Sequence, residues 1–119
     1  MILFKNVRPI IGGKLEKACN IYVKDGKINK ITSLDDIQNA DIVYNLNGGI
    51  LAAGYIDIHT HGGGGHDVME GTKVALDEIS KYHLITGSTT YIPTTLTADI
   101  PTTLQAIDNV RKYKSPYAR

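Results

Sequence analysis

The sequence predicts an α/β fold, in which a small β unit over residues 1–52 precedes alternating strands and helices over residues 53–119. Short β-branched segments separated by turn residues fill the first part of the chain. An apolar strand over residues 54–61 then breaks into a run of glycines. Two amphipathic helical patterns follow, separated by a threonine-rich strand, and this alternation is typical of a parallel α/β arrangement.

The β unit is predicted to contain four strands, over residues 2–7, 19–24, 27–32 and 41–46. Asp25-Gly26 supplies a two-residue hairpin turn, because both central positions of such a turn need φ > 0. Pro9 and two glycines indicate a loop or a tight turn over residues 9–18, and Asn47-Gly48-Gly49 is expected to end the fourth strand.

In the second part, a helix is expected to begin at Glu70 or Thr72 and to end at Thr86. Its buried face is predicted to consist of Ala75, Ile79, Tyr82 and Ile85. A strand over residues 88–95 and a second helix over residues 100–114 follow. The buried face of that second helix is predicted to consist of Leu104, Ile107 and Val110.

Two histidines end the apolar strand that opens the second part. Side chains alternate along a strand, so Asp57, His59 and His61 are expected on one face, with the Cα atoms of the histidines roughly 7 Å apart. Ile56 and Ile58 are expected to pack against a covering layer on the other face. Isolated His-x-His pairs are most often ordinary surface or core residues, but the apolar strand and the glycine run favour a metal site. Neutral imidazole suits zinc or iron, so we predict that His59 and His61 bind one divalent cation.

Several residues near this strand have open interpretations. Asp57 could orient a metal ligand, or it could be a buried carboxylate bonded to backbone groups. The glycines of residues 62–65 could let backbone N–H groups approach an anion, or they could form a mobile loop tip. His66 and Asp67 could reach the mouth of the site, but they are expected to be exposed loop residues. His83 is expected to be an exposed helix residue, and Thr94 and Thr95 are expected to be walls of the site without a catalytic role.

The segment Gly54-Tyr55-Ile56-Asp57-Ile58-His59-Thr60-His61 resembles the first barrel strand of the amidohydrolase superfamily, whose signature is Gly, any residue, Ile, Asp, any residue, His, any residue, His. Dihydroorotases and hydantoinases follow the second histidine closely with an arginine, whereas this chain has glycines there. The segment Gly87-Ser88-Thr89-Thr90-Tyr91-Ile92-Pro93-Thr94-Thr95-Leu96-Thr97 resembles the second strand of N-acetylglucosamine-6-phosphate deacetylases. That family is therefore the best match. The similarity covers essentially the whole of this chain and the N-terminal third of the family's proteins.

The resemblance implies a portion of a β-sandwich over residues 1–52, followed over residues 53–119 by the first strand-helix units of an incomplete (β/α)8 barrel. It also implies a metal-dependent hydrolase that removes the acetyl group of N-acetylglucosamine 6-phosphate, with His59 and His61 as metal ligands. The family's catalytic aspartate and its other metal ligands correspond to positions beyond residue 119, so no catalytic residue is assigned in this chain.

A complete eight-fold barrel takes about 250 residues, so we expect an N-terminal fragment of a longer enzyme that is inactive in isolation. The β unit should expose an apolar face or a strand edge, which predicts a homo-oligomer. Two alternatives stay open. One is another amidohydrolase that acts on a cyclic amide, and the other is a non-catalytic assembly fragment.

Composition restricts the partners and the compartment. The chain has 13 basic and 12 acidic residues and a net charge of +1, which gives no electrostatic argument for nucleic acid or a membrane surface. The expected partner is a small-molecule amino-sugar phosphate. The single cysteine, Cys19, cannot form an internal disulfide, which fits a cytoplasmic location. No apolar run reaches the roughly 20 residues of a membrane-spanning helix.

Overall fold

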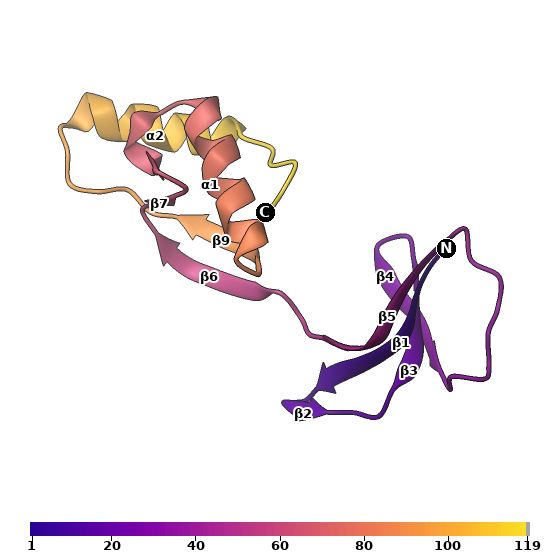
Figure 1. The fold of residues 1–119 in the computed structure, drawn as a ribbon. Coiled ribbons are helices and arrows are strands. Elements are labelled where there is room, and N and C mark those ends of the chain that lie inside the picture. Colours follow the sequence, from indigo (N-terminus) through magenta and orange to yellow (C-terminus); the bar gives the residue numbers. More distant parts are fainter. Residues whose placement is uncertain (119) are drawn as a thin grey trace. The chain divides into compact units, whose positions relative to one another are not determined.

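The computed structural model of the chain describes residues 1–118 and divides them into two compact units (Figure 1). The division falls between Ala53 and Gly54. The first unit is a twisted sheet, and the second packs two α-helices beside a pair of strands. Of the described residues, none belongs to a helix long and apolar enough to cross a membrane.

Five strands form the sheet of the first unit: β1 (Ile2–Ile11), β2 (Lys14–Leu15), β3 (Cys19–Lys24), β4 (Lys27–Thr32) and β5 (Ile42–Leu51). Strand β3 lies antiparallel between β1 and β4, and β5 runs parallel to β1. The turn between β3 and β4 is the two-residue hairpin that the sequence predicts, with φ values of 51° at Asp25 and 73° at Gly26.

Two strands of this sheet are longer than the sequence predicts. Strand β1 continues to Ile11 and β5 to Leu51. Of the loop or tight turn expected over residues 9–18, the tight turn is present, because Gly12 and Gly13, with φ values of 58° and 76°, connect β1 to β2 in an antiparallel hairpin. Asn47 and Gly48 have φ values of 50° and 81°, and the register of β5 against β1 shifts around them. These turn-forming residues make a bulge inside the paired strands instead of ending β5.

Apolar side chains remain exposed on the first unit. Its buried core includes Leu3, Val7 and Tyr22, whereas Ile28 on β4 and Ile50 on β5 are 66% and 61% exposed. Exposed apolar surface of this kind was expected from the sequence, and the homo-oligomer inferred from it stays a prediction.

The second unit contains the predicted alternation of strand and helix. Strands β6 (Tyr55–Thr60) and β9 (Ser88–Pro93) pair in parallel, and α1 (Lys73–Ile85) lies between them in the chain. A hairpin of β7 (Gly62–Gly63) and β8 (His66–Asp67) and the short helix η1 (Val68–Glu70) precede α1, and α2 (Ile100–Lys112) follows β9. The core of this unit contains Val68, Leu76, Ile79, Tyr91 and Ala118.

The buried faces of both helices differ from the predicted ones. Helix α1 buries Ala75, Leu76, Ile79, Ser80 and His83. Tyr82 and Ile85, which were expected to be buried, are 43% and 75% exposed. Helix α2 buries Ala106 and packs Val110 against the core, while Leu104 and Ile107 are largely exposed.

Polar contacts across the core account for the rotated faces. The hydroxyl of Tyr113, which follows α2, lies 2.9 Å from Ser80 Oγ and 3.1 Å from the carbonyl oxygen of Leu76. A buried hydroxyl needs such a partner, so Ser80 turns inward to meet Tyr113. Periodicity of apolar residues alone does not reveal a face that includes a serine.

Candidate metal centre

The pairing of β6 with β9 is interrupted by a bulge just before the histidines. Asp57 pairs with Tyr91, but the next pair is Thr60 with Pro93, so β6 carries one extra residue. Tyr91 and Pro93 are two residues apart and share a face of the sheet, and Asp57 and Thr60 therefore share that face too. This is the face that packs on α1, because Thr60 and Tyr91 are both buried.

The bulge places His59 and His61 on the opposite face from Asp57. The expectation that Asp57 shares a face with the two histidines is therefore wrong, because it assumed an uninterrupted strand. Ile56 and Ile58 are 66% and 74% exposed within the described residues. The expectation that they pack under a covering layer is wrong as well, since the covered side of β6 is the side of Asp57.

The imidazole rings of His59 and His61 converge. Their Nε2 atoms are 3.2 Å apart, and the ring planes meet at 84°. The Nδ1 atom of His61 lies 3.0 Å from the backbone oxygen of Thr94, just beyond the end of β9. A carbonyl oxygen only accepts hydrogen bonds, so Nδ1 of His61 must carry the hydrogen. The Nε2 atom of a neutral His61 then presents its lone pair toward His59.

This geometry fits two ligands of one cation. Zinc–nitrogen bonds of 2.0–2.1 Å at tetrahedral to octahedral angles put the two nitrogens about 2.8–3.4 Å apart. The distance of 3.2 Å between the Nε2 atoms lies inside that range. A hydrogen bond from Nε2 of His59 to Nε2 of His61 would have a similar length. Such a hydrogen bond and a bound cation therefore compete for the lone pair on Nε2 of His61. Among residues 1–118, no group of three or more His, Cys, Asp or Glu side chains is arranged to hold a metal ion.

Asp57 is bonded to the backbone beside the pair. Its Oδ1 accepts the N–H of His59 at 3.0 Å. A bulge leaves a backbone N–H without its ladder partner, and Asp57 supplies the replacement. Of the two interpretations that the sequence left open, the structure favours the carboxylate bonded to the backbone, here next to a histidine of the pair.

His83 is buried, contrary to the expectation of an exposed helix residue. It is 6% exposed, and its ring stacks on Tyr91 with centroids 4.9 Å apart. Its Nδ1 lies 3.8 Å from Oδ2 of Asp57. The sequence did contain a signal, because His83 continues the helical spacing of Ala75 and Ile79, four residues apart each time.

The glycines after the pair form an ordered hairpin. Gly64 and Gly65, with φ values of 64° and 86°, make the turn between β7 and β8. A Cβ atom at Gly62 would lie 2.1 Å from the oxygen of His66, and one at Gly63 would lie 2.7 Å from the ring of Tyr82. Close packing against β8 and α1 therefore requires glycine here, and the segment is not a free loop tip.

His66 and Asp67 are half-buried and engaged with η1 instead of being exposed loop residues. Asp67 accepts the N–H of Met69 at 2.7 Å and caps η1. Glu70 accepts the N–H of Asp67 and lies 3.2 Å from Nδ1 of His66. These two contacts hold the pKa of Glu70 below its usual range.

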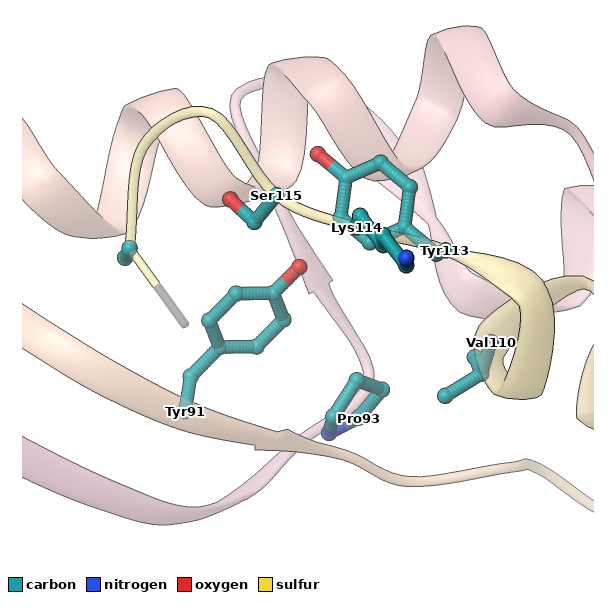
Figure 2. Close-up of a pocket in the computed structure, with 7 residues that line it drawn as sticks. Tyr91, Pro93, Val110, Tyr113, Lys114 and Ser115 are labelled. Atoms are coloured by element: carbon teal, nitrogen blue, oxygen red, sulfur yellow. The ribbon is translucent and has the colours of Figure 1, made fainter.

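A cavity of about 450 Å³ lies on the covered face of the β6–β9 pair, the face opposite to His59 and His61 (Figure 2). It is lined by Tyr91, Pro93, Val110, Tyr113, Lys114, Ser115 and Ala118. Tyr91 and Pro93 belong to the face of Asp57, so this cavity does not adjoin the histidine pair. Burial raises the pKa of the Tyr91 phenol to about 12, which leaves it neutral at physiological pH.

No protein-family model matches the chain. An N-acetylglucosamine-6-phosphate deacetylase of Vibrio furnissii is 36% identical over 112 residues, which are 93% of this chain and 28% of that protein. The N-acetylglucosamine-6-phosphate deacetylase of Bacillus subtilis (strain 168) is 29% identical over 115 residues, 96% of this chain and 29% of that protein. The resemblance to these deacetylases is confirmed. The chain spans less than a third of the length of either relative.

Solved structures share the fold. The crystal structure of N-acetylglucosamine-6-phosphate deacetylase from Pasteurella multocida matches with a TM-score of 0.82 at 24% identity, over 95% of this chain and 31% of that one. A deacetylase from Mycobacterium smegmatis in complex with N-acetyl-D-glucosamine-6-phosphate matches with a TM-score of 0.71 at 20% identity, over 92% of this chain and 28% of that one.

Weaker similarity extends to two other hydrolases. A dihydroorotase of Bacillus cytotoxicus is 37% identical over 59 residues, half of this chain and 14% of that protein. The L-hydantoinase of Arthrobacter aurescens matches with a TM-score of 0.59 at 20% identity, over 91% of this chain and 24% of that one. The deacetylases thus match this chain better in sequence coverage and in structure.

Proposed function

We propose that His59 and His61 are two ligands of a divalent cation, zinc or iron, in a metal-dependent hydrolase. The observation that carries this proposal is the approach of the two Nε2 atoms to 3.2 Å. The hydrogen bond of His61 to the Thr94 carbonyl adds to it, because metal-bound histidines characteristically donate their other ring N–H to such an acceptor.

We propose that the substrate is an N-acetylated amino-sugar phosphate and that the reaction removes its acetyl group. The names of the relatives support this substrate class. A bound divalent cation would supply Lewis acidity to the amide carbonyl and lower the pKa of a bound water. The chain's own part is to hold the imidazole of His61 through the Thr94 carbonyl and the backbone of His59 through Asp57.

We further propose that residues 53–119 form the first strand-helix units of a (β/α)8 barrel, and that residues 1–52 form part of a β-sandwich. Two parallel strands joined by a helix support the barrel assignment. In barrel enzymes the reacting groups lie at the C-terminal ends of the strands. The position of His59 and His61 at the end of β6 agrees with this rule.

The alternative is a hydrolase of cyclic amides. The glycine hairpin argues against it, because hydantoinases and dihydroorotases have an arginine close behind the second histidine. At Gly62 and Gly63 even a Cβ atom would collide with its neighbours. A side chain reaching from this hairpin toward a substrate carboxylate would need a different packing of β7 on α1.

Calorimetric titration of the chain with zinc chloride tests the proposed ligands. We expect one zinc ion per chain, and loss of binding in H59A and in H61A. His66 is the matched control, because it is a half-buried histidine of the same segment that pairs with Glu70. Zinc binding in H66A should equal that of the wild type. Binding that survives both H59A and H61A, or that fails only in H66A, would contradict the proposal.

A further inference from the structure

His83, Tyr91 and Asp57 form a cluster behind the histidine pair. The three side chains come from α1, β9 and β6 and meet on the covered face of the strand pair. His83 is more than nine-tenths buried, and its ring lies parallel to that of Tyr91, with an interplanar angle of 10°. The stacking fixes the plane of the imidazole, and the plane determines where its ring nitrogens point.

One nitrogen of His83 faces Asp57, and the other has no partner. Nδ1 lies 3.8 Å from Oδ2 of Asp57, which is within the range of an electrostatic contact but too long for a hydrogen bond. Nε2 is buried without a hydrogen-bond partner in the part of the chain that the structure describes. Burying a ring nitrogen unpaired is unfavourable, so packing alone would be served better by an apolar side chain.

Asp57 connects this cluster to the metal ligands. Its Oδ2 faces His83, while its Oδ1 accepts the N–H of His59. The hydrogen bond to Oδ1 replaces the ladder contact that the bulge removes from His59. The bulge in turn is what puts His59 and His61 on the face opposite Asp57. A side chain that holds the carboxylate in place therefore also holds the backbone of a proposed ligand.

We propose that His83 is a positioning residue for the histidine pair, acting through Asp57. In this role Nδ1 of His83 faces Oδ2 of Asp57 at 3.8 Å and attracts the carboxylate electrostatically, which keeps Oδ1 on the amide of His59. The role assigned to the pair rests on the proposed function, but the contact from His83 through Asp57 to the His59 amide exists without metal and can be measured without it.

Four variants of the full chain separate this role from simple packing. H83N keeps an amide nitrogen near the position of Nδ1, whereas H83Q places its amide near the position of Nε2. H83L keeps a side chain of similar volume without a polar group. I79A is the packing control, because Ile79 is fully buried one turn earlier on α1 and is in neither contact. Two quantities are measured at one pH: the hydrogen-exchange rate of the His59 amide without metal, and the affinity for cobalt(II).

We expect H83L and H83Q to speed exchange of the His59 amide about tenfold and to weaken cobalt binding about tenfold, the lower end of the usual effect of a residue behind a metal ligand. H83N should restore both quantities. I79A should loosen the unit without a selective change at His59. An unchanged His59 amide in folded H83L, or equal behaviour of H83N and H83Q, would overturn the proposal.

The two readouts also distinguish failure of this proposal from failure of the proposed function. If the wild-type chain binds no cobalt, the proposed metal site is wrong, and the exchange rates still decide whether His83 holds Asp57 on the His59 amide. If H83L does not fold, the comparison of H83N with H83Q decides the same question, since both keep a polar amide of similar size.

Discussion

At the scale of single residues, two hydrogen bonds that involve backbone groups position His59 and His61. The Thr94 carbonyl sets the tautomer of His61, and the Asp57 carboxylate takes the amide of His59. Neither contact requires a metal, so the ring of His61 and the backbone of His59 are positioned before any cation binds. Binding to a preorganised pair loses less side-chain entropy than binding to two freely rotating histidines.

Glycine substitutions test whether the hairpin behind the pair is as tightly packed as the structure indicates. Gly62→Ala would place its Cβ 2.1 Å from a backbone oxygen that cannot move alone, whereas Gly63→Ala would meet the ring of Tyr82, which is partly exposed and can rotate. We expect a loss of about 3 kcal/mol for Gly62→Ala and about 1 kcal/mol for Gly63→Ala. Urea unfolding measures both, and equal or negligible losses would contradict a packed hairpin.

At the scale of elements, α1 and α2 are joined by the hydroxyl of Tyr113. It lies within 3.1 Å of Ser80 Oγ, the Leu76 oxygen and Asp77 Oδ1. Tyr113→Phe should destabilise the second unit by about 1–3 kcal/mol, because Ser80 is fully buried and loses its side-chain partner. Thermal unfolding followed by circular dichroism measures this. Tyr117→Phe is the control, since that ring is largely exposed, and equal effects of the two variants would contradict the assignment.

The first turn of α1 should make stability depend on pH. Lys73 Nζ, 2.6 Å away, and then the Tyr113 hydroxyl hold the pKa of Asp77 below its ordinary value. A carboxyl with a lowered folded-state pKa stabilises the fold above its unfolded pKa, about 3.9, and loses that contribution as pH falls through the folded pKa. Urea midpoints of wild type and Asp77→Asn should therefore differ at pH 7 and converge as the pH falls through the lowered folded-state pKa of Asp77. A constant difference would contradict the pairing.

Sequence patterns predicted the elements better than their faces. The β3–β4 hairpin, strands β6 and β9 and the extents of both helices follow from local turn chemistry and periodicity. The buried faces of the helices depend on Ser80 and His83, whose partners come from other elements. The bulge in β6 was missed because no glycine or proline marks it. Its one local sign is Asp57, placed two residues before the amide that it binds.

At the scale of the whole molecule, two imidazoles are fewer ligands than catalysis requires. A catalytic zinc normally has three protein ligands and a water, and residues 1–118 bring together two histidines. We expect this chain alone, with zinc added, to release no acetate from N-acetylglucosamine 6-phosphate above the uncatalysed background. An enzyme-coupled acetate assay measures this, and release that is lost in H59A would contradict the expectation.

The most direct test of the central claim is a long-range ¹H–¹⁵N NMR spectrum of the histidine rings, recorded with and without one equivalent of zinc. We predict that Nε2 of both His59 and His61 shifts on addition of zinc, while Nδ1 of His61 keeps the signature of a protonated nitrogen bonded to the Thr94 carbonyl. Binding through Nδ1 of His61, or shifts confined to His66 and His83, would contradict the account.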